Sequence, residues 1–365
     1  MDRKLELKAL RKSFDGVEAV KGIDLVLNRG EFLSLLGPSG CGKSTTLSLI
    51  AGFLQPDAGE ILVDGQVVNN VSPRKRRIGL VFQDYAVFSK LSVRANLAFG
   101  LEAQGVPRRE RNRAVAEISE KLTLTPILGA RGGDLNMSEM QRVALACVLV
   151  TKPELLLLDE PMSNLDAALR AKLRGELKQI QKELQQTVLY VTHDQVEALS
   201  MSDRIAVMRD GEILQDGSTE AIYRRPVERF VAEFIGDPPI NMMACTLACE
   251  AGEVRVSTVL HRDLSLGRGE ISPGDYLLAI RPHHIRASHE AGEGTVESDV
   301  RLVENFGAEH VLHVAYGEDL VAVVVAPGFA REGERIHLAL QADQARLFDP
   351  GSGRVIALQR REVAA

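Results

Sequence analysis

The chain has 365 residues, with 45% hydrophobic residues, 26% charged residues and a formal net charge of −6. This length fits two domains better than one, and the composition is typical of a globular protein. The acidic balance excludes the basic footprint of a nucleic-acid-binding protein and argues against general attraction to an anionic membrane surface. The apolar runs are far shorter than the roughly 18 residues that a membrane-spanning helix needs. The four cysteines show no paired framework, which fits a reducing cytosol.

Alternating strands and helices are predicted over residues 1–235. Residues 31–37 are a short apolar run that ends in Gly, and residues 44–53 have helical apolar spacing. The leucine run at 155–158 is typical of a strand that is buried on both faces of a parallel sheet. Helical patterns dominate residues 84–152. We therefore expect an α/β core that carries a helical insert.

The character of the sequence changes near residues 235–243, where Pro238 and Pro239 end the preceding helical pattern. Short β-like runs punctuated by glycines follow. These patterns predict a second domain over residues 236–365, a small all-β barrel of the OB-like kind.

The segment from Gly37 to Ser44 matches the pattern G-x-x-x-x-G-K-[ST] between a predicted strand and a predicted helix. Glycines let backbone N–H groups close around phosphate oxygens, and the helix directs its positive end to the same place. Lys43 is expected to reach the β and γ phosphates, and Ser44 to bind Mg²⁺. The alternative, an ordinary glycine-rich turn, rarely has this order and context. The candidate nucleotide-binding residues here are Gly37, Pro38, Ser39, Gly40, Cys41, Gly42, Lys43, Ser44 and Thr45.

Polar side chains end three of the apolar runs. Asp159 and Glu160 follow the leucine run, at the strand end where α/β sheets bind ligands. Asp159 is a candidate Mg²⁺ ligand, and Glu160 a candidate general base for the attacking water. His193 follows the run at 187–192 and could contact the γ-phosphate, although such a histidine is more often structural. Gln83 ends another run, and the residues alone leave its role open.

These elements, in this order, resemble the nucleotide-binding subunit of an ABC transporter. The phosphate loop aligns with the Walker A motif of that family, Gln83 with its Q-loop and residues 135–142 with its signature. Leu158-Asp159-Glu160 align with its Walker B motif, Ser163-Asn164-Leu165-Asp166 with its D-loop, and His193 with its switch histidine. Residues 81–93 and 192–218 are especially similar to ATPases of bacterial carbohydrate importers. Residues 280–286 and 303–314 are similar to the C-terminal TOBE-type barrels of those ATPases. The resemblance implies an ABC-type P-loop fold over nearly the whole chain.

The resemblance also implies the ligands and their contacts. ATP and Mg²⁺ are expected, with Ser44, Gln83 and Asp159 at the metal and Asp166 at the nucleotide. Phe14 aligns with the aromatic residue that stacks on adenine; the alternative is a core aromatic at a strand end. Residues 85–91 align with the surface on which a permease docks. An exposed Tyr85 or Phe88 would be part of that contact patch.

The expected partners follow from the same family. Two ATPase subunits pair head to tail, with each ATP held between the Walker A loop of one subunit and the signature segment of the other. Two transmembrane permease subunits and a periplasmic or extracellular solute-binding protein complete the transporter, and no nucleic acid takes part. The resemblance places the chain at the cytoplasmic face of the bacterial inner membrane as a peripheral subunit. The resemblance implies that the solute is a carbohydrate, a polyol or glycerol phosphate.

One segment departs from the family. Where its signature reads Leu-Ser-Gly-Gly-Gln, this chain has Leu135 followed by Asn136, Met137, Ser138 and Glu139. These residues would face the ATP of the partner, and side chains replace glycines where backbone must approach phosphate. Glu139 adds a negative charge near a tetra-anionic ligand. Since the Walker residues and His193 are retained, we hypothesise a heterodimer with one competent site; a tolerant homodimer is the alternative.

Two other functions remain open at this stage. One is a mainly regulatory, weakly hydrolytic ABC subunit whose β domain binds a cytosolic protein or metabolite. The other is an ABC protein outside transport, in DNA repair or translation. Such proteins commonly carry two nucleotide domains or a coiled-coil insert, and this chain has one such domain and no heptad run. We therefore expect an ATPase that drives solute import.

Overall fold

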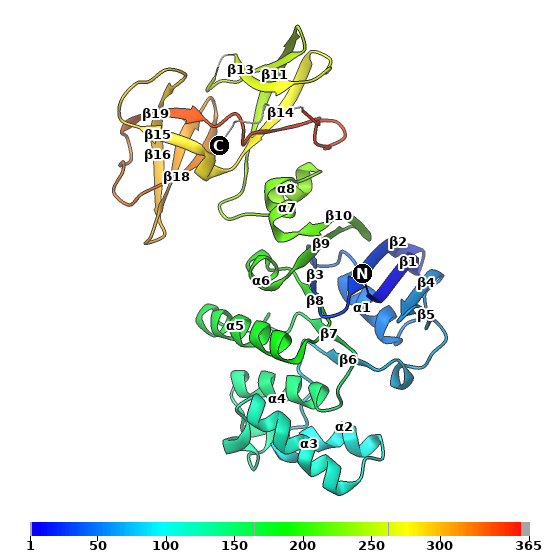
Figure 1. Cartoon of the computed structure of the whole chain (residues 1–365). Coiled ribbons are helices and arrows are strands. Elements are labelled where there is room, and N and C mark those ends of the chain that lie inside the picture. Colours follow the sequence, from blue (N-terminus) through cyan, green and yellow to red (C-terminus); the bar gives the residue numbers. More distant parts are fainter. Residues whose placement is uncertain (1, 164, 262, 359–365) are drawn as a thin grey trace. The chain divides into compact units, whose positions relative to one another are not determined.

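The computed structural model describes residues 2–163, 165–261 and 263–358 (Figure 1). The chain forms two compact units that divide between Glu220 and Ala221. The domain boundary that we predict after residue 235 therefore lies further along the chain than this division. The reason is local, because Ala232 is buried against Ile240 and its neighbours in the second unit.

Two β-sheets form the framework of the first unit. Its strands are β1 (Arg3–Phe14), β2 (Val17–Asn28), β3 (Phe32–Leu36), β4 (Ala58–Val63), β5 (Gln66–Val67), β6 (Ile78–Val81), β7 (Leu155–Asp159), β8 (Val188–Thr192), β9 (Arg204–Arg209) and β10 (Glu212–Ser218). One sheet is antiparallel, with the strand order β2-β1-β4-β5. The other has the order β10-β9-β3-β8-β7-β6, and only its β9–β10 pair is antiparallel. The predicted α/β core is thus confirmed.

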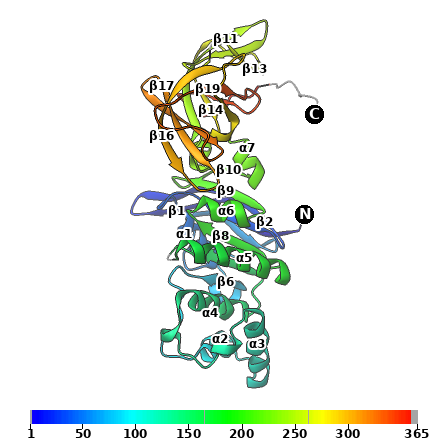
Figure 2. The same ribbon diagram turned by 90° about the vertical axis from the view of Figure 1, so that its left-hand side faces the viewer.

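Helices cover the second of these sheets and form the predicted insert. The helices of this unit are α1 (Lys43–Ala51), α2 (Val93–Ala103), α3 (Arg108–Lys121), α4 (Met137–Leu149), α5 (Ala167–Leu184) and α6 (Gln195–Met201), with short 3₁₀ turns η1 (Pro73–Lys75), η2 (Thr125–Ile127) and η3 (Gly132–Asp134). Figure 2 shows α2, α3 and α4 gathered at one end of the unit, beyond β6. Among the described residues, no helix is both long and apolar enough to cross a membrane.

The leucine run of β7 is buried on both faces, as predicted. Leu156 and Leu158 belong to the core beneath α4 and α5. Leu155 and Leu157 belong to a second core that includes α1 and the antiparallel sheet. Because side chains alternate along a strand, a strand between two cores must be apolar at every position. This double burial holds the end of β7, where the polar residues begin, in a fixed place.

The second unit is built from two antiparallel five-stranded sheets. Their orders are β13-β12-β11-β14-β20 and β15-β19-β16-β17-β18. The strands are β11 (Asn241–Glu250), β12 (Glu253–Ser257), β13 (Leu264–Arg268), β14 (Gly274–Ile280), β15 (Ile285–Ser288), β16 (Val296–Asn305), β17 (His310–Tyr316), β18 (Asp319–Val325), β19 (Arg335–Leu340) and β20 (Arg346–Phe348). The short helices α7 (Thr219–Arg224) and α8 (Arg229–Phe234) precede them, and η4 (Pro282–His284) follows β14. The all-β prediction for this part of the chain is confirmed.

Buried His261 makes the second unit sensitive to acid. Its Nε2 atom accepts a hydrogen bond from the Leu340 amide at 3.0 Å, and only 7% of the residue is exposed. Burial lowers the pKa of His261 below its ordinary value of 6.5, as it also does for His283 and His284. The unfolded chain therefore binds more protons than the folded chain below about pH 6.5. Stability should be fully present above that pH and decline as the pH falls.

The prediction is checked by urea unfolding of the full chain between pH 8 and pH 5, followed through the second unit. His261→Gln should reduce the pH dependence without removing it, because His283 and His284 remain. An identical pH slope in His261→Gln and the unaltered protein would contradict this account.

Candidate nucleotide-binding site

Two glycines allow the loop between β3 and α1 to pack closely against its surroundings. A Cβ atom at Gly37 would lie 2.1 Å from the Met208 carbonyl oxygen, and one at Gly42 would lie 2.3 Å from the Ala19 carbonyl oxygen. Gly42 also has a φ of 108°, a left-handed conformation that side chains disfavour. The glycine spacing of the motif is therefore required by the structure of this loop.

Lys43 lies inside the loop. Its Nζ atom donates hydrogen bonds to the carbonyl oxygens of Gly37 and Pro38, each at 2.8 Å, and only 4% of its side chain is exposed. The same atom lies 3.8 Å from Oε1 of Glu160. A buried ammonium surrounded by neutral carbonyls and one carboxylate attracts an anion that reaches the loop.

Ser44 and Asp159 meet although they lie far apart in the sequence. Ser44 Oγ donates a hydrogen bond to Oδ1 of Asp159 at 2.9 Å. Burial raises the pKa of Asp159, and the nearby charge of Glu160 raises it further, while the Ser44 bond and Lys43 act in the opposite direction. A hydroxyl and a carboxylate are ligands that suit Mg²⁺, and a bound cation would favour the ionised form of Asp159.

Glu160 and His193 form the second pair. His193 Nδ1 lies 2.9 Å from Oε2 of Glu160, and His193 is the more exposed partner. The backbone of Glu160 is left-handed, with a φ of 44°, and its amide donates to the Val191 carbonyl at 3.0 Å. A non-glycine residue in this conformation costs free energy and is often found at functional sites. In this chain the left-handed residue, Glu160, is also the one whose carboxylate lies near both Lys43 and His193.

Gln83 joins this group through one intermediate residue. Its Nε2 atom donates to Ser163 Oγ at 3.2 Å, and Ser163 Oγ donates to the Glu160 carbonyl at 3.0 Å. The sequence indicates no such role for Ser163, because Gln83 is 80 positions away. Only the strand order, which pairs β6 with β7, brings the two residues together.

Comparisons with known proteins agree with this geometry. The family model described as "ABC transporter" matches residues 20–163, and the model described as "TOBE domain" matches residues 278–348. The trehalose/maltose import ATP-binding protein MalK of Thermococcus litoralis is 38% identical over 94% of this chain and 97% of its own length. The sn-glycerol-3-phosphate import ATP-binding protein UgpC of Cereibacter sphaeroides is 39% identical over 96% of this chain and 99% of its own.

Two further likenesses extend the comparison. The xylose/arabinose import ATP-binding protein XacJ of Haloferax volcanii is 38% identical over 99% of this chain and 97% of its own. The solved structure of cbiO1 from Clostridium perfringens, part of the ABC transporter complex cbiONQ, has a TM-score of 0.57 and 31% identity; the match covers 61% of this chain and 91% of that one. This chain belongs to the ATP-binding subunits of ABC transporters. The resemblance and the fold class predicted from the sequence are thereby confirmed.

In this ABC subunit the unusual signature segment forms a helix cap. Asn136 Oδ1 accepts a hydrogen bond from the Glu139 amide at 3.0 Å, and the Asn136 amide donates to Glu139 Oε2 at 3.1 Å. This reciprocal capping box begins α4. The pattern Asn-x-x-Glu was visible in the sequence, but we did not predict the cap. Met137 is 40% exposed, and Ser138 is half-buried. The substitutions therefore preserve the start of the helix while adding a carboxylate to it.

Within the described part of the chain, the remaining predicted residues share no hydrogen bond with the side chains that gather around Lys43 and Glu160. Phe14 is 43% exposed at the end of β1, so it is not a core aromatic. Asp166 Oδ1 accepts from the Leu169 amide at 2.9 Å and caps α5. Asn164 lies outside the described residues. In the phosphate loop and α1, Ser39 and Gly40 are exposed, Thr45 is half-buried, and burial raises the pKa of the Cys41 thiol.

Residues 85–91, the segment expected to contact a permease, contain less exposed aromatic surface than the sequence suggests. Tyr85 is only 5% exposed, and its hydroxyl donates to the Pro161 carbonyl at 3.0 Å. Phe88, by contrast, is 48% exposed and lies beside Phe99 of α2, with ring centroids 4.8 Å apart. Tyr85 is therefore an anchor inside the unit, because its hydroxyl finds a buried acceptor, and Phe88 remains available for contact.

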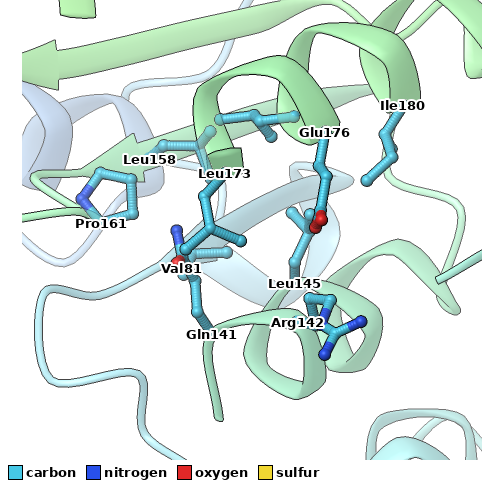
Figure 3. Close-up of a pocket in the computed structure, with 10 residues that line it drawn as sticks. Val81, Gln141, Arg142, Leu145, Leu158, Pro161, Leu173, Glu176 and Ile180 are labelled. Carbon is cyan, nitrogen blue, oxygen red and sulfur yellow. The ribbon is translucent and has the colours of Figure 1, made fainter. Parts of the chain in front are cut away.

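A small cavity lies between α4, α5 and the strands β6 and β7, and its lining includes Leu158 and Pro161, which flank Asp159 and Glu160 (Figure 3). Its volume is about 30 Å³, and Gln141, Arg142 and Leu173 are among its lining residues. That volume corresponds to about one water molecule. The cavity therefore cannot hold a nucleotide, and the loop around Lys43 is the better candidate.

Buried Glu197 supports the strand that leads to His193. Tyr190 and Thr192 of β8 donate hydrogen bonds to Glu197 Oε2, each at 2.7 Å, and burial raises the pKa of Glu197. We expect Tyr190→Phe to lower the free energy of unfolding by about 1–3 kcal/mol, because a buried acceptor loses a donor. Denaturant unfolding measures this loss. Tyr276→Phe, which removes an exposed hydroxyl, should change little; equal effects of both variants would contradict the prediction.

Proposed function

We propose that the chain hydrolyses ATP to drive the import of a carbohydrate-type solute, with the residues around Lys43 as the reaction site. The observation that carries this proposal is the convergence of two pairs, Ser44 with Asp159 and His193 with Glu160, on the loop that holds Lys43. The solute class is supported by the relatives, whose names specify trehalose/maltose, xylose/arabinose and sn-glycerol-3-phosphate.

Each residue has a separate task in this proposal. Lys43 and the loop amides bind the phosphates, and Ser44, Asp159 and Gln83 hold Mg²⁺, which would neutralise charge on the phosphate oxygens. Glu160 accepts a proton from the attacking water, an effect worth about 10²–10⁴ in rate. His193 holds the Glu160 carboxylate in position. Phe14 and Asp166 bind the nucleotide from outside this cluster.

The partner arrangement is part of the same proposal. A second ATPase subunit completes the site, two permease subunits span the membrane at whose cytoplasmic face the chain lies, and a solute-binding protein delivers the solute. Asn136, Met137, Ser138 and Glu139 would face the ATP of the second subunit. Because a carboxylate lies at the start of α4, we infer that the second subunit is a different protein with an intact signature. A homodimer that tolerates these residues is the alternative.

The departure at residues 136–139 also favours a second candidate function, a mainly regulatory and weakly hydrolytic subunit. Reconstitution of the complete transporter in vesicles distinguishes the two. If this chain hydrolyses ATP for import, Lys43→Ala should abolish ATP-driven solute uptake, because the phosphate-binding charge is lost. Lys8→Ala, which removes an exposed cation of β1, should leave uptake unchanged. Undiminished uptake with Lys43→Ala would favour the regulatory candidate.

A further inference from the structure

The net charge of −6 conceals a strongly basic segment. Residues 74–131 contain twelve Lys and Arg residues and five Asp and Glu residues, in a chain that has 44 and 50 of them in total. The rest of the chain is correspondingly acidic. A charge asymmetry of this size within one protein suggests a surface that binds a polyanion. The overall net charge alone argues against such binding.

Two contacts bring basic residues of this segment to one place. Arg74 Nη2 donates a hydrogen bond to the Ala103 carbonyl at 2.6 Å, and Arg111 pairs with Glu102 at 2.6 Å. Ala103 and Glu102 are at the C-terminal end of α2, so η1 and the start of α3 both meet that end. We call this surface the α2–α3 corner; its basic residues are Arg74, Lys75, Arg108, Arg109, Arg111 and Arg113.

Three of these cations have no partner among the described residues of the unit. Arg108, Arg109 and Arg113 are exposed, and their side chains make no ion pair or hydrogen bond with any described residue. They lie in the first two turns of α3, whose N-terminal end carries positive partial charge. Cations are unfavourable there, so these arginines oppose the stability of their own helix. Cations at a helix N-terminus that no interaction within the fold offsets are typical of a functional surface.

The corner also adjoins the patch through which the subunit would contact its permease. Phe88 of that patch touches Phe99 of α2, which lies one helical turn before Ala103. A permease spans the membrane, so a corner beside its contact patch would lie on the side of the unit from which the membrane is approached. This step rests on the proposed function, because it assumes that residues 85–91 contact a permease.

We propose that the α2–α3 corner binds the headgroups of anionic phospholipids at the membrane surface. Exposed, unpaired arginines spread over two helical turns suit a diffuse negative surface better than a single directional acceptor. The corner would hold the nucleotide-binding unit against the bilayer while the rest of the acidic chain is repelled from it. The attraction is electrostatic and should weaken as salt is added.

The test is co-sedimentation of the full chain with vesicles of phosphatidylcholine alone or mixed with phosphatidylglycerol. Binding should require phosphatidylglycerol, and the combined variant Arg108→Gln, Arg109→Gln and Arg113→Gln should lower the partition coefficient by about 100-fold. The triple change of the same residues to Lys should retain binding. The matched control is Lys172→Gln, Arg174→Gln and Lys182→Gln on α5, which removes the same charge elsewhere and should have little effect.

Three results would overturn the proposal. They are absent binding of the unaltered chain, equal binding to both kinds of vesicle, and equal losses in the two triple variants. A fourth comes from the detergent-solubilised transporter, where loss of permease co-purification in the α3 variant would assign the corner to a protein partner. Its ATPase rate in detergent should be unchanged. A failed vesicle test with normal ATP-driven transport would refute only the lipid proposal. The proposed function would be refuted if Lys43→Ala retained both solute uptake and ATP hydrolysis.

Discussion

Replacement of Glu160 by Gln is expected to lower ATP turnover by about 10²–10⁴-fold while MgATP binding persists. Gln has nearly the same shape but cannot accept the proton of the attacking water. The Lys43 loop and the Ser44–Asp159 pair, which would bind phosphate and metal, do not depend on that proton. Phosphate release by the reconstituted transporter measures turnover, and a fluorescent ATP analogue measures binding.

The control for this prediction is Glu117→Gln on the exposed side of α3, which removes the same charge far from the loop in sequence. It should retain both turnover and binding. If Glu160→Gln hydrolysed ATP at the normal rate, Glu160 would not be the base. If it lost nucleotide binding as well, the carboxylate would serve the structure of the loop through Lys43 and His193 rather than the chemistry.

The second large effect is expected from restoring the family signature. The combined variant Asn136→Ser, Met137→Gly, Ser138→Gly and Glu139→Gln should raise the ATPase rate of transporters that contain this chain as their sole ATPase. The expected gain is about 10²–10³-fold, since a lost donor in a preorganised anion site commonly costs that much. Glu139→Gln alone should give part of the gain, because it keeps the capping box and removes its negative charge.

The comparison must account for the stability of α4. Two added glycines at a helix start cost up to about 1 kcal/mol each, so thermal unfolding of each variant is measured alongside its ATPase rate. The unaltered chain paired with a second ATPase of intact signature should already be active. The homodimer alternative would be supported instead if the unaltered chain alone showed full solute-stimulated activity and the restored variant gained nothing.

Much of the first unit could be predicted because its signals are local. The apolar runs at 32–36 and 155–158 and the glycine-lysine loop between strand and helix depend on neighbouring residues alone. The antiparallel sheet of β1, β2, β4 and β5 was not predicted. Its register pairs Leu5 with Leu27 and Val63, and no short window of sequence contains such partners.

The site shows the same limit. Lys43, Ser44, Asp159, Glu160 and His193 were predicted from motifs, and the structure brings them together. Their partners in space were harder to foresee. The burial of Tyr85 depends on a carbonyl 76 positions later, and an aromatic residue that follows the polar pair Gln83-Asp84 looks exposed from the sequence alone. The helix cap at Asn136 is different, because its pattern is local and could have been recognised.

Tyr85 and Gln83 have a consequence for the timing of the reaction. The Tyr85 hydroxyl holds the Pro161 carbonyl, and the Gln83 amide holds Ser163, so the short turn after Glu160 is fastened at two points to the segment that leads into residues 86–91. A force applied to that segment by a neighbouring protein would not be absorbed by a slack loop. A displacement of that segment would instead be passed through these two hydrogen bonds to the turn that follows Glu160.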